Sequence, residues 1–442
     1  MSTFLAQSLT DWLKLAPQPR PLTGKDVWNV FLSYRSVDRP WTMNLYDVLT
    51  QHGYKVYIDQ CALPAGSELT ARLQQALQAS QSGVLIWSSA TSESDWVAKE
   101  YSTLDRMAST KPGFYFVPVR VDPSELPSFI ANRVYLDFSA YPDGPNGSDL
   151  LRLLHGIVGQ PLSREAADFA LKLNEAAKQA ADDVNAAIFN KDPGQLKDLF
   201  KTGGLAWQTS SALACKTAEG LIKLKRNDDA IAMLEQIEKQ FLRAIRPQQL
   251  HALALARRGQ GDDLKQAQRI LGRLYQDGQR DPETLGIYGR TWMDRYNKSN
   301  DPSDLQQSRD LYVEAFQRAP DDYYTGIKAA AKSVLLGTPS DVELGGKLAD
   351  QVQTIVGTDP VQGDYWKTAT VGEVFLLRKN YADAGRVYKA AVAMARAEIG
   401  SHESTWKQGC HLMEKLQPTA EERAMVRAPF SHLPDCDQIL GA

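Results

Sequence analysis

Runs of β-branched and aromatic residues occur only in the first third of this chain, and that restriction most limits its fold. Most of the runs are apolar nearly throughout, which is typical of parallel strands covered on both faces. Helix-period segments separate them, so we predict an open, doubly wound α/β sheet of five strands. The runs are WNVFLSY (28–34), YKVYI (54–58), GVLIWS (83–88), FYFVPVRV (114–121) and RVYLDF (133–138).

The segments between these runs have the 3.6-residue period of helices. Asp38 is expected to cap a helix that reaches Gln51, and Ser67 to cap a second one. Asp95 opens a third helix that continues through Ala108, and residues 148–158 form the last helix of the domain.

Strand signals disappear from Leu162 onward, and helix pairs recur in their place. Turn signals are spaced about 34 and then about 40 positions apart, a period typical of helical repeats. Small residues alternate with large ones on the second helix of each pair, as in tetratricopeptide repeats. We therefore predict an N-terminal helix and linker (1–25), the α/β domain (26–160), a helical connector (161–203), tetratricopeptide-like repeats (204–418) and a C-terminal cap or tail (419–442).

Length and composition indicate a globular protein with two or three domains. The chain has 442 residues, of which 43% are hydrophobic and 23% charged, with a formal net charge of -3. A nucleic-acid-binding protein normally shows a basic excess, and this chain does not. No apolar run approaches the ~20 residues that cross a bilayer, and the N-terminus lacks the features of a signal peptide. We expect a cytoplasmic protein that binds neither nucleic acid nor membrane.

The four cysteines are far apart in the sequence and form no CxxC pair, which suits a reducing compartment. Cys410, His411, His432 and Cys436 could be combined into a zinc site, but their spacing fits no common zinc motif. We expect scattered core thiols and no metal.

Ligands of open α/β sheets bind outside the carboxyl ends of the strands, where the strand order reverses. In a five-stranded, flavodoxin-like order this point lies between the first and third strands. The candidates are Ser33, Tyr34 and Arg35 after the first strand and Ser88 after the third, while Asp59 follows the second. The chain has no GxGxxG after the first strand and no GxxxxGK[ST], which argues against dinucleotide redox chemistry and P-loop hydrolysis.

The helix after the third strand begins with Ser-Asp-Trp-Val-Ala-Lys-Glu-Tyr. Trp96 and Glu100 are four residues apart, so they share one stripe of this helix. An aromatic ring and a carboxylate above a ligand crevice make a chemically useful pair. A half-buried tryptophan beside a solvated glutamate is the structural alternative.

Three short segments, FLSYRS (31–36), YIDQCALPAGSEL (57–69) and SDWVAKEYSTL (94–104), together resemble the Toll/interleukin-1 receptor (TIR) domain family over residues 26–158. The third segment is particularly similar to the branch that cleaves NAD, which includes bacterial antiphage effectors. The region from about 204 to 418 more loosely resembles the tetratricopeptide-like region of apoptosis-signal-regulating kinases.

The resemblance implies that Glu100 is the catalytic residue. It also implies that the segment from Asp59 to Gly66, with Leu63, Pro64 and Ala65, is a loop that contacts a neighbouring TIR domain. Cys61 and Ala62 stand where many members carry charged residues, so the contacts of this loop do not transfer in detail.

The chemistry of NAD suits a single carboxylate. Its nicotinamide is already a cationic leaving group, so no general acid is needed to protonate it, unlike in ordinary glycosides. Glu100 could hold the ribose and stabilise the positive charge that develops there, and Trp96 could stack on the nicotinamide. Arg35 and the strand-end serines could contact phosphate oxygens; for Arg35 the alternative is an ion pair with Asp38 or Asp59. Asp59 is expected to brace its loop.

We therefore predict an NAD+ glycohydrolase, an NAD+ nucleosidase that uses NAD+ as substrate and needs no cofactor, as in an immune or antiphage effector. ADP-ribosyl cyclase activity remains open. We expect the chain to form homo-oligomers through its TIR domain and to receive a protein or ligand trigger through its repeats. The alternatives are a non-enzymatic TIR and tetratricopeptide adaptor and, with less support because no second carboxylate is evident, a nucleoside-modifying enzyme.

Overall fold

The computed structural model describes residues 15–35, 38–58, 69–89, 95–127, 130, 133–141, 144–241 and 244–440. Within these ranges it describes only the backbone of 69–73 and 95–100. The chain divides into two compact units, Met1–Gln279 and Arg280–Ala442, and each is treated by itself.

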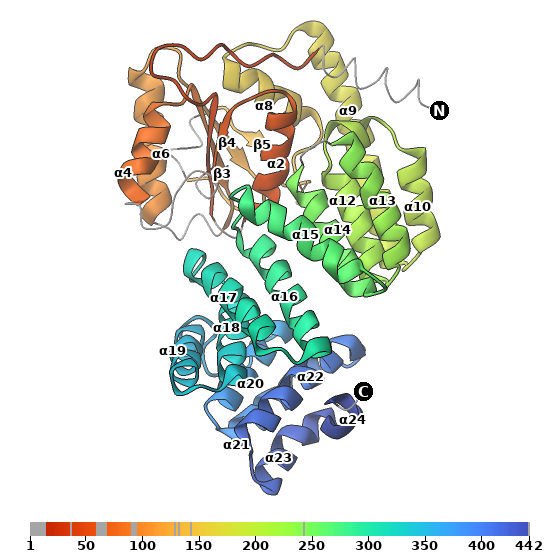
Figure 1. Cartoon of the computed structure of the whole chain (residues 1–442). Coiled ribbons are helices and arrows are strands. Elements are labelled where there is room, and N and C mark those ends of the chain that lie inside the picture. Colours follow the sequence, from red (N-terminus) through yellow and green to blue (C-terminus); the bar gives the residue numbers. More distant parts are fainter. Residues whose placement is uncertain are drawn as a thin grey trace. The chain divides into compact units, whose positions relative to one another are not determined.

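The first unit contains a five-stranded parallel sheet in the order β2-β1-β3-β4-β5. This confirms the predicted flavodoxin-like α/β fold, in which the order reverses between β1 and β3. Figure 1 labels three of these strands, β3, β4 and β5. The edge strands β2 and β5 are shorter than predicted. The strands are β1 (Val30–Ser33), β2 (Val56–Tyr57), β3 (Ser82–Trp87), β4 (Tyr115–Arg120) and β5 (Leu136–Asp137).

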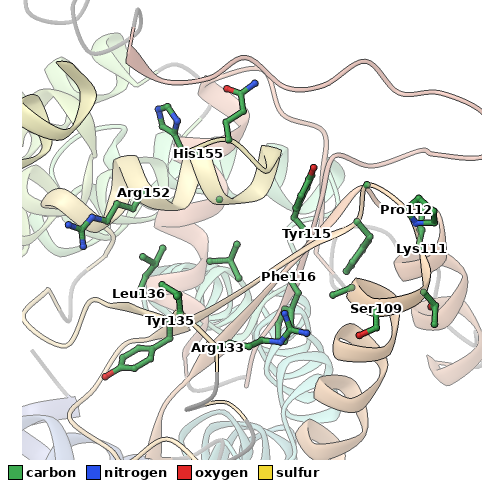
Figure 2. A pocket seen from close by; sticks show the side chains of 18 of the residues that line it. Ser109, Lys111, Pro112, Tyr115, Phe116, Arg133, Tyr135, Leu136, Arg152 and His155 are labelled. Atoms are coloured by element: carbon green, nitrogen blue, oxygen red, sulfur yellow. The ribbon is translucent and has the colours of Figure 1, made fainter. Parts of the chain in front are cut away.

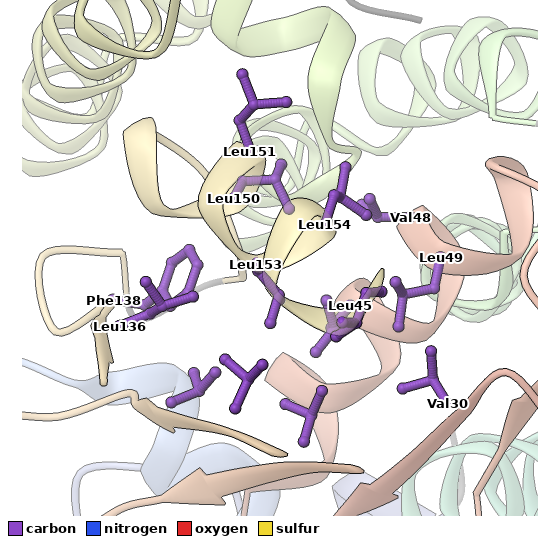
Figure 3. Packing of buried hydrophobic residues seen from close by; sticks show 14 of the residues in the cluster. Val30, Leu45, Val48, Leu49, Leu136, Phe138, Leu150, Leu151, Leu153 and Leu154 are labelled. Atoms are coloured by element: carbon purple, nitrogen blue, oxygen red, sulfur yellow. The ribbon is translucent and has the colours of Figure 1, made fainter. Parts of the chain in front are cut away.

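Helices cover both faces of the sheet because alternate strand residues point to opposite sides. Val30 contributes to a core with the leucines of α2 and α8 (Figure 3), and Leu32 belongs to the same core. Phe31, between them, packs on the other face with α4 and α6. Both faces are therefore apolar, which explains the continuous apolar runs in the sequence. The helices are α2 (Arg39–Gln51), α4 (Leu69–Gln78), α6 (Asp95–Thr110) and α8 (Ser148–Val158).

The predicted connector forms a long helix whose start belongs to the α/β core. The Ser163 side chain caps α9 by accepting a hydrogen bond from the Ala166 backbone N–H. Ala166, Ala170 and Leu173 then pack into the core beneath α8. Helix pairs follow in the same unit, with bounds α9 (Arg164–Phe189), α10 (Pro193–Thr202), α11 (Leu205–Thr209), α12 (Ala212–Lys223), α13 (Asn227–Gln240), α14 (Ile245–Arg258) and α15 (Asp263–Gln276).

The repeats of the first unit pack directly on the α/β domain. Met43 of α2 and Ile58 at the end of β2 form a buried cluster with Ile245 of α14 and Leu274 of α15. The Asp47 carboxylate accepts a hydrogen bond of 3.0 Å from the Ile245 backbone N–H, at the first residue of α14. A side chain of the α/β domain thus caps a repeat helix.

The second unit is helical throughout its described residues, and its helices form consecutive antiparallel pairs (Figure 1). Asp281, Asp301, Asp322, Thr338 and Asp364 each cap the helix that follows. The bounds are α16 (Pro282–Ser299), α17 (Pro302–Arg318), α18 (Tyr323–Leu336), α19 (Pro339–Val356), α20 (Tyr365–Leu377), α21 (Tyr381–Met394), α22 (Ile399–Leu416), α23 (Ala420–Arg427), the 3-10 helix η2 (Ala428–Phe430) and α24 (Cys436–Leu440).

The pairing of Cys410 with Cys436 corrects the expectation of scattered core thiols. They form a disulfide between α22 and α24, with Cα atoms 5.2 Å apart. Cys215 is a buried free thiol, and Cys61 lies outside the described residues. Within the described part, no three His, Cys, Asp or Glu side chains gather as a metal site, and no helix is long and apolar enough to span a membrane.

Two adjacent glycines of α19 provide a test of the helix packing. A Cβ on Gly345 would lie 2.8 Å from Val334 Cγ2 and 3.0 Å from the Ala330 carbonyl oxygen of α18, whereas one on Gly346 would meet nothing within 4 Å. We expect Gly345→Ala to lower the melting temperature of the full chain by about 2 °C, because overpacking outweighs the gain in helix propensity. Gly346→Ala should raise it by about 2 °C. Calorimetric melts that shift in the same direction for both variants would contradict this packing.

Candidate functional site at the carboxyl edge of the sheet

The carboxyl ends of β1 and β3 carry the predicted site residues whose side chains the structure describes. Ser33 is the last residue of β1, and Tyr34 and Arg35 follow it. Ser88 and Ser89 follow β3. Because the strands are parallel, these ends meet at one edge of the sheet, next to the point where the strand order reverses.

Asp38 connects the loops after β1 and β3. It precedes α2 as predicted, but its side chain makes no capping hydrogen bond. Instead its carboxylate accepts a hydrogen bond of 2.7 Å from the Ser88 hydroxyl. Burial raises the pKa of Asp38 to about 6, although the hydrogen bond from Ser88 lowers it. The negative charge of Asp122 also raises this pKa, and the positive charge of Arg35 lowers it.

Asp122, which the sequence interpretation did not single out, is a second carboxylate at this edge. It accepts hydrogen bonds from the backbone N–H groups of Ser89 (2.7 Å) and Ser124 (3.1 Å) and from the Ser124 hydroxyl. Partial burial opposes ionisation, but the hydrogen bonds from Ser124 and Ser89 outweigh it and hold the pKa of Asp122 below its usual range. Its position two residues after β4, in an Asp-x-Ser turn, was the signal that could have identified it.

The nucleoside-modifying enzyme had less support because the sequence showed no second carboxylate, and this edge of the sheet carries two, Asp38 and Asp122. They differ strongly in environment, since Asp122 is stabilised as an anion and Asp38 titrates near neutral pH. Such a divergence is common where one group must be charged and another must exchange a proton.

Tyr34 and Arg35 have different surroundings. The Tyr34 hydroxyl accepts a hydrogen bond of 2.8 Å from Nη1 of the buried Arg39, and its ring packs against the α2 core and the cluster around Met43. Arg35 is partly exposed and acts electrostatically on Asp38. The structure is therefore compatible with an ion pair between Arg35 and Asp38, and equally with contact between Arg35 and a phosphate group at this edge of the sheet.

Trp96 and Glu100 belong to the first turns of α6, which follows the carboxyl end of β3. Their side chains are outside the described part of the structure, as are Asp59 and the assembly-loop residues Leu63, Pro64, Ala65 and Gly66. The later part of α6 behaves as the period predicted, since Tyr101 and Leu104 are buried against the sheet.

A cavity of about 770 Å³ lies elsewhere on the α/β domain, between the end of α6, β4, β5 and α8. Arg152 and His155 come from α8 and Tyr115 and Phe116 from β4 (Figure 2). The residues from Lys111 to Tyr115 precede or open β4, so this β4–β5 cavity is at the amino edge of the sheet. It is distinct from the predicted site.

The charges of the β4–β5 cavity are already paired. Lys111 contacts Asp26 at 2.8 Å, Arg133 contacts Asp105, and Arg152 contacts Asp149 at 3.3 Å. Val134, which is 91% exposed, adds an apolar side chain to a lining that mixes polar and apolar residues.

A flavodoxin-like sheet with polar residues at its carboxyl edge, followed by helix pairs, defines an α/β domain fused to helical repeats. A family model described as "TIR domain" matches residues 30–154, and one described as "Tetratricopeptide Repeats-Sensor" matches residues 226–335. The chain therefore contains a TIR domain followed by tetratricopeptide sensor repeats, which confirms the resemblance to the TIR family and to tetratricopeptide repeats.

Two solved structures resemble parts of the chain. The TIR domain of the Toll-related receptor TRR-2 from Hydra magnipapillata is 20% identical, with a TM-score of 0.23, over 25% of this chain and 85% of that one. A thermophilic tetratricopeptide-repeat protein from Thermus thermophilus is 14% identical, with a TM-score of 0.36, over 44% of this chain and 96% of that one. These likenesses carry no argument about the site. No curated protein matches the sequence.

The titration of Asp38 provides a test of the site's electrostatics. The pKa of Asp38 is about 6 in the folded protein, against an ordinary value of 3.8. The ionised Asp38 carboxylate therefore destabilises the fold fully above pH 6, and this destabilisation disappears as the pH falls from 6 to 4. Asp38→Asn keeps an acceptor for Ser88. We expect it to raise the melting temperature by about 2–4 °C at pH 7.5, from about 1 kcal/mol after allowing for partial exposure, and to have little effect at pH 4.5.

Asp122→Asn is the matched control, because the pKa of Asp122 is lowered. It should lower the melting temperature at pH 7.5. Calorimetry that gave Asp38→Asn the same effect at both pH values would show that Asp38 is not a buried, titrating carboxylate.

Proposed function

We propose that this protein is an NAD+ glycohydrolase that becomes active when its TIR domains associate. Support comes from the TIR family match over residues 30–154 and from the placement of α6 at the carboxyl edge of the sheet. The observation that carries the proposal is the polar edge itself, where Asp38 and Ser88 join the ends of β1 and β3 at the point of strand reversal.

Each residue of this edge has a proposed part in the reaction. Glu100 stabilises the positive charge that develops on the ribose as the bond to nicotinamide breaks, and water then attacks the anomeric carbon. Trp96 stacks on the leaving nicotinamide. Arg35 and Ser88 contact the diphosphate, and Ser88 does so by turning its hydroxyl proton from Asp38 to a phosphate oxygen. Asp122, fixed by Ser89 and Ser124, stays anionic and orders the loop.

Assembly is proposed because the loop from Leu63 to Gly66 contains apolar residues and Val134 exposes an apolar side chain at the β4–β5 cavity. A large aliphatic side chain that is 91% exposed, as Val134 is, favours contact with another apolar surface. We commit to a second copy of the chain as the occupant, with its loop 63–66 seated at this cavity.

The contact between α2 and the repeats gives the proposed control of assembly. Ile58 directly precedes the segment that carries the assembly loop, and it is buried against Ile245 and Leu274 of the repeats. A shift of α14 or α15 would therefore change the packing at the root of the loop. We propose that the repeats restrain the loop until a trigger moves these helices.

A non-enzymatic adaptor remains the second candidate, because many TIR domains only bind partners. Its support is the exposed side chains of Val134 and Tyr135, which an adaptor would use equally. The two candidates differ in whether the chain consumes NAD+.

Replacing the proposed catalyst tests the enzymatic function. Glu100→Gln keeps size and helix propensity but removes the charge, so we expect NAD+ cleavage to fall at least ~100-fold. Nicotinamide release by purified full chain, with and without a crowding agent, is the measurement. Glu175→Gln, at an exposed position of α9, is the control and should retain activity. Soluble Glu100→Gln protein that cleaves NAD+ at the wild-type rate would show that Glu100 is not the catalytic residue.

Two charge insertions test the proposed assembly. Ala65→Asp places a charge in the loop and Val134→Asp places one at the cavity rim, so each should lower specific activity about 10-fold or more by opposing desolvation at the contact. Wild-type specific activity should rise with protein concentration. Val342→Asp, at an exposed position of the second unit, is the control and should have no effect.

Mixing the variants distinguishes assembly from misfolding. A chain with an intact loop can pair with one that has an intact cavity, so equal amounts of Ala65→Asp and Val134→Asp should recover part of the lost activity. Specific activity that stays constant over a broad dilution series, with only monomers seen by light scattering, would show that the site is complete in one chain.

A further inference from the structure

Four helices of the second unit direct charged side chains into one cluster. The first helices of consecutive pairs pack on one another, α18 against α20 and α22, and α20 against α22. The Arg290 guanidinium lies 3.6 Å from the Asp294 carboxylate on α16, and the Lys328 ammonium of α18 lies 3.8 Å from the Glu373 carboxylate of α20. Lys332 of α18 interacts electrostatically with Lys328, Glu373 and Asp294.

The fourth helix adds positive charge to this cluster. Lys407 of α22 interacts with Asp294, and His411, one turn later, interacts with both Lys407 and Lys332. Arg290, Lys328 and the exposed Lys407 therefore face two carboxylates (Asp294 and Glu373), and Lys332 adds a further positive charge when it is protonated. The cost of the unbalanced charge falls mainly on Lys332, because this lysine is buried.

Buried polar atoms at the centre of the cluster are without partners among the described residues. Glu373 is 7% exposed and its Oε1 accepts no hydrogen bond. Nε2 of His411, the α22 residue that interacts with Lys332, also has none. Lys332 is 3% exposed, and its ammonium lies over the Tyr312 ring, 5.1 Å from the centroid. Such groups normally find partners, so their number here points to a ligand.

The ionisation of Lys332 agrees with an excess of positive charge. Burial lowers its pKa to about 7, and the charge of Lys328 acts in the same direction, while Glu373 and Asp294 oppose the shift. Burial and the two lysines also lower the pKa of His411 to about 4, so His411 is neutral. A bound anion would supply the missing negative charge and restore the proton to Lys332.

We propose that this cluster, centred on Lys332 and Glu373, is a binding site for a small phosphorylated molecule that also carries hydroxyl groups, such as a sugar phosphate. The phosphate accepts hydrogen bonds from Lys332, Lys328 and Lys407, which supply the charge-assisted contacts. A ligand hydroxyl donates to Oε1 of Glu373. This assignment does not depend on cleavage of NAD+, and it gives the repeats a ligand of their own.

Titration calorimetry on the full chain tests the site, with ribose 5-phosphate as the probe and inorganic phosphate and ribose as comparisons. We expect ribose 5-phosphate to bind at least ~10-fold more tightly than phosphate, because only it engages Glu373, and ribose alone to give no heat. Binding should weaken as the pH rises from 6.5 to 8.5, since Lys332 loses its proton in the free protein. Absence of binding by ribose 5-phosphate overturns the proposal, and so does equal affinity for phosphate.

Two substitutions separate binding from a structural role. Lys332→Met should weaken ribose 5-phosphate binding at least ~10-fold while raising the melting temperature, because a buried cation is replaced by an apolar side chain of similar length. Glu373→Gln should strengthen binding of inorganic phosphate by ~3-fold or more, because it removes a competing anion. Lys347→Met, an exposed lysine of α19 paired with Glu343, is the matched control.

Retention of ribose 5-phosphate binding by folded Lys332→Met protein would overturn the assignment. Loss of phosphate binding in Glu373→Gln would also overturn it, because that result would make Glu373 a structural partner of the lysines.

Discussion

The hydrogen bond between the Asp47 carboxylate and the backbone N–H of Ile245 joins two folds that could otherwise be independent. Helix α14 has no capping side chain of its own, since Ala244 occupies its N-cap. Its first N–H groups are buried, and leaving them without an acceptor would cost about 1–3 kcal/mol each. The α/β domain therefore completes a repeat helix, and the repeats in turn cover Met43 and Ile58. Burial raises the pKa of Asp47 to about 8, so this contact forms with the carboxyl largely neutral at pH 7.

The parallel sheet concentrates chemistry at one edge because every strand ends there. That rule alone allowed the position of Ser33, Arg35 and Ser88 at this edge to be predicted from the order of the apolar runs. The strands themselves could be predicted because both faces are buried, which makes the runs continuous. The β5 run was predicted too long: Val134 and Tyr135 are exposed, so apolar character there reflects a surface and not a strand.

What the sequence could not predict depends on contacts between distant residues. Asp38 is a reasonable helix cap by local rules, yet its carboxylate is held by Ser88, 50 residues away. Asp47 and Ile245 are 198 residues apart, and nothing local marks Asp47 as a cap for another helix. Cys410 and Cys436 look unrelated until α22 and α24 bring them together. The predicted catalyst Glu100 stays a prediction, since only the backbone of that turn is described.

The energies involved limit how a trigger could release the proposed restraint. The four apolar side chains that join α2 and β2 to the repeats contribute at most about 6–12 kcal/mol, at 1.5–3 kcal/mol for each fully buried side chain. Moving a two-state equilibrium from 1:99 to 99:1 requires about 5.5 kcal/mol of differential binding. A ligand at 1,000 times its Kd supplies about 4 kcal/mol. In the proposed mechanism, a small molecule at the repeats would therefore fall short by itself, and association of the TIR domains would contribute the remainder. Trigger and assembly would then act as one cooperative step, and the proposed cleavage of NAD+ would stay off when either is missing.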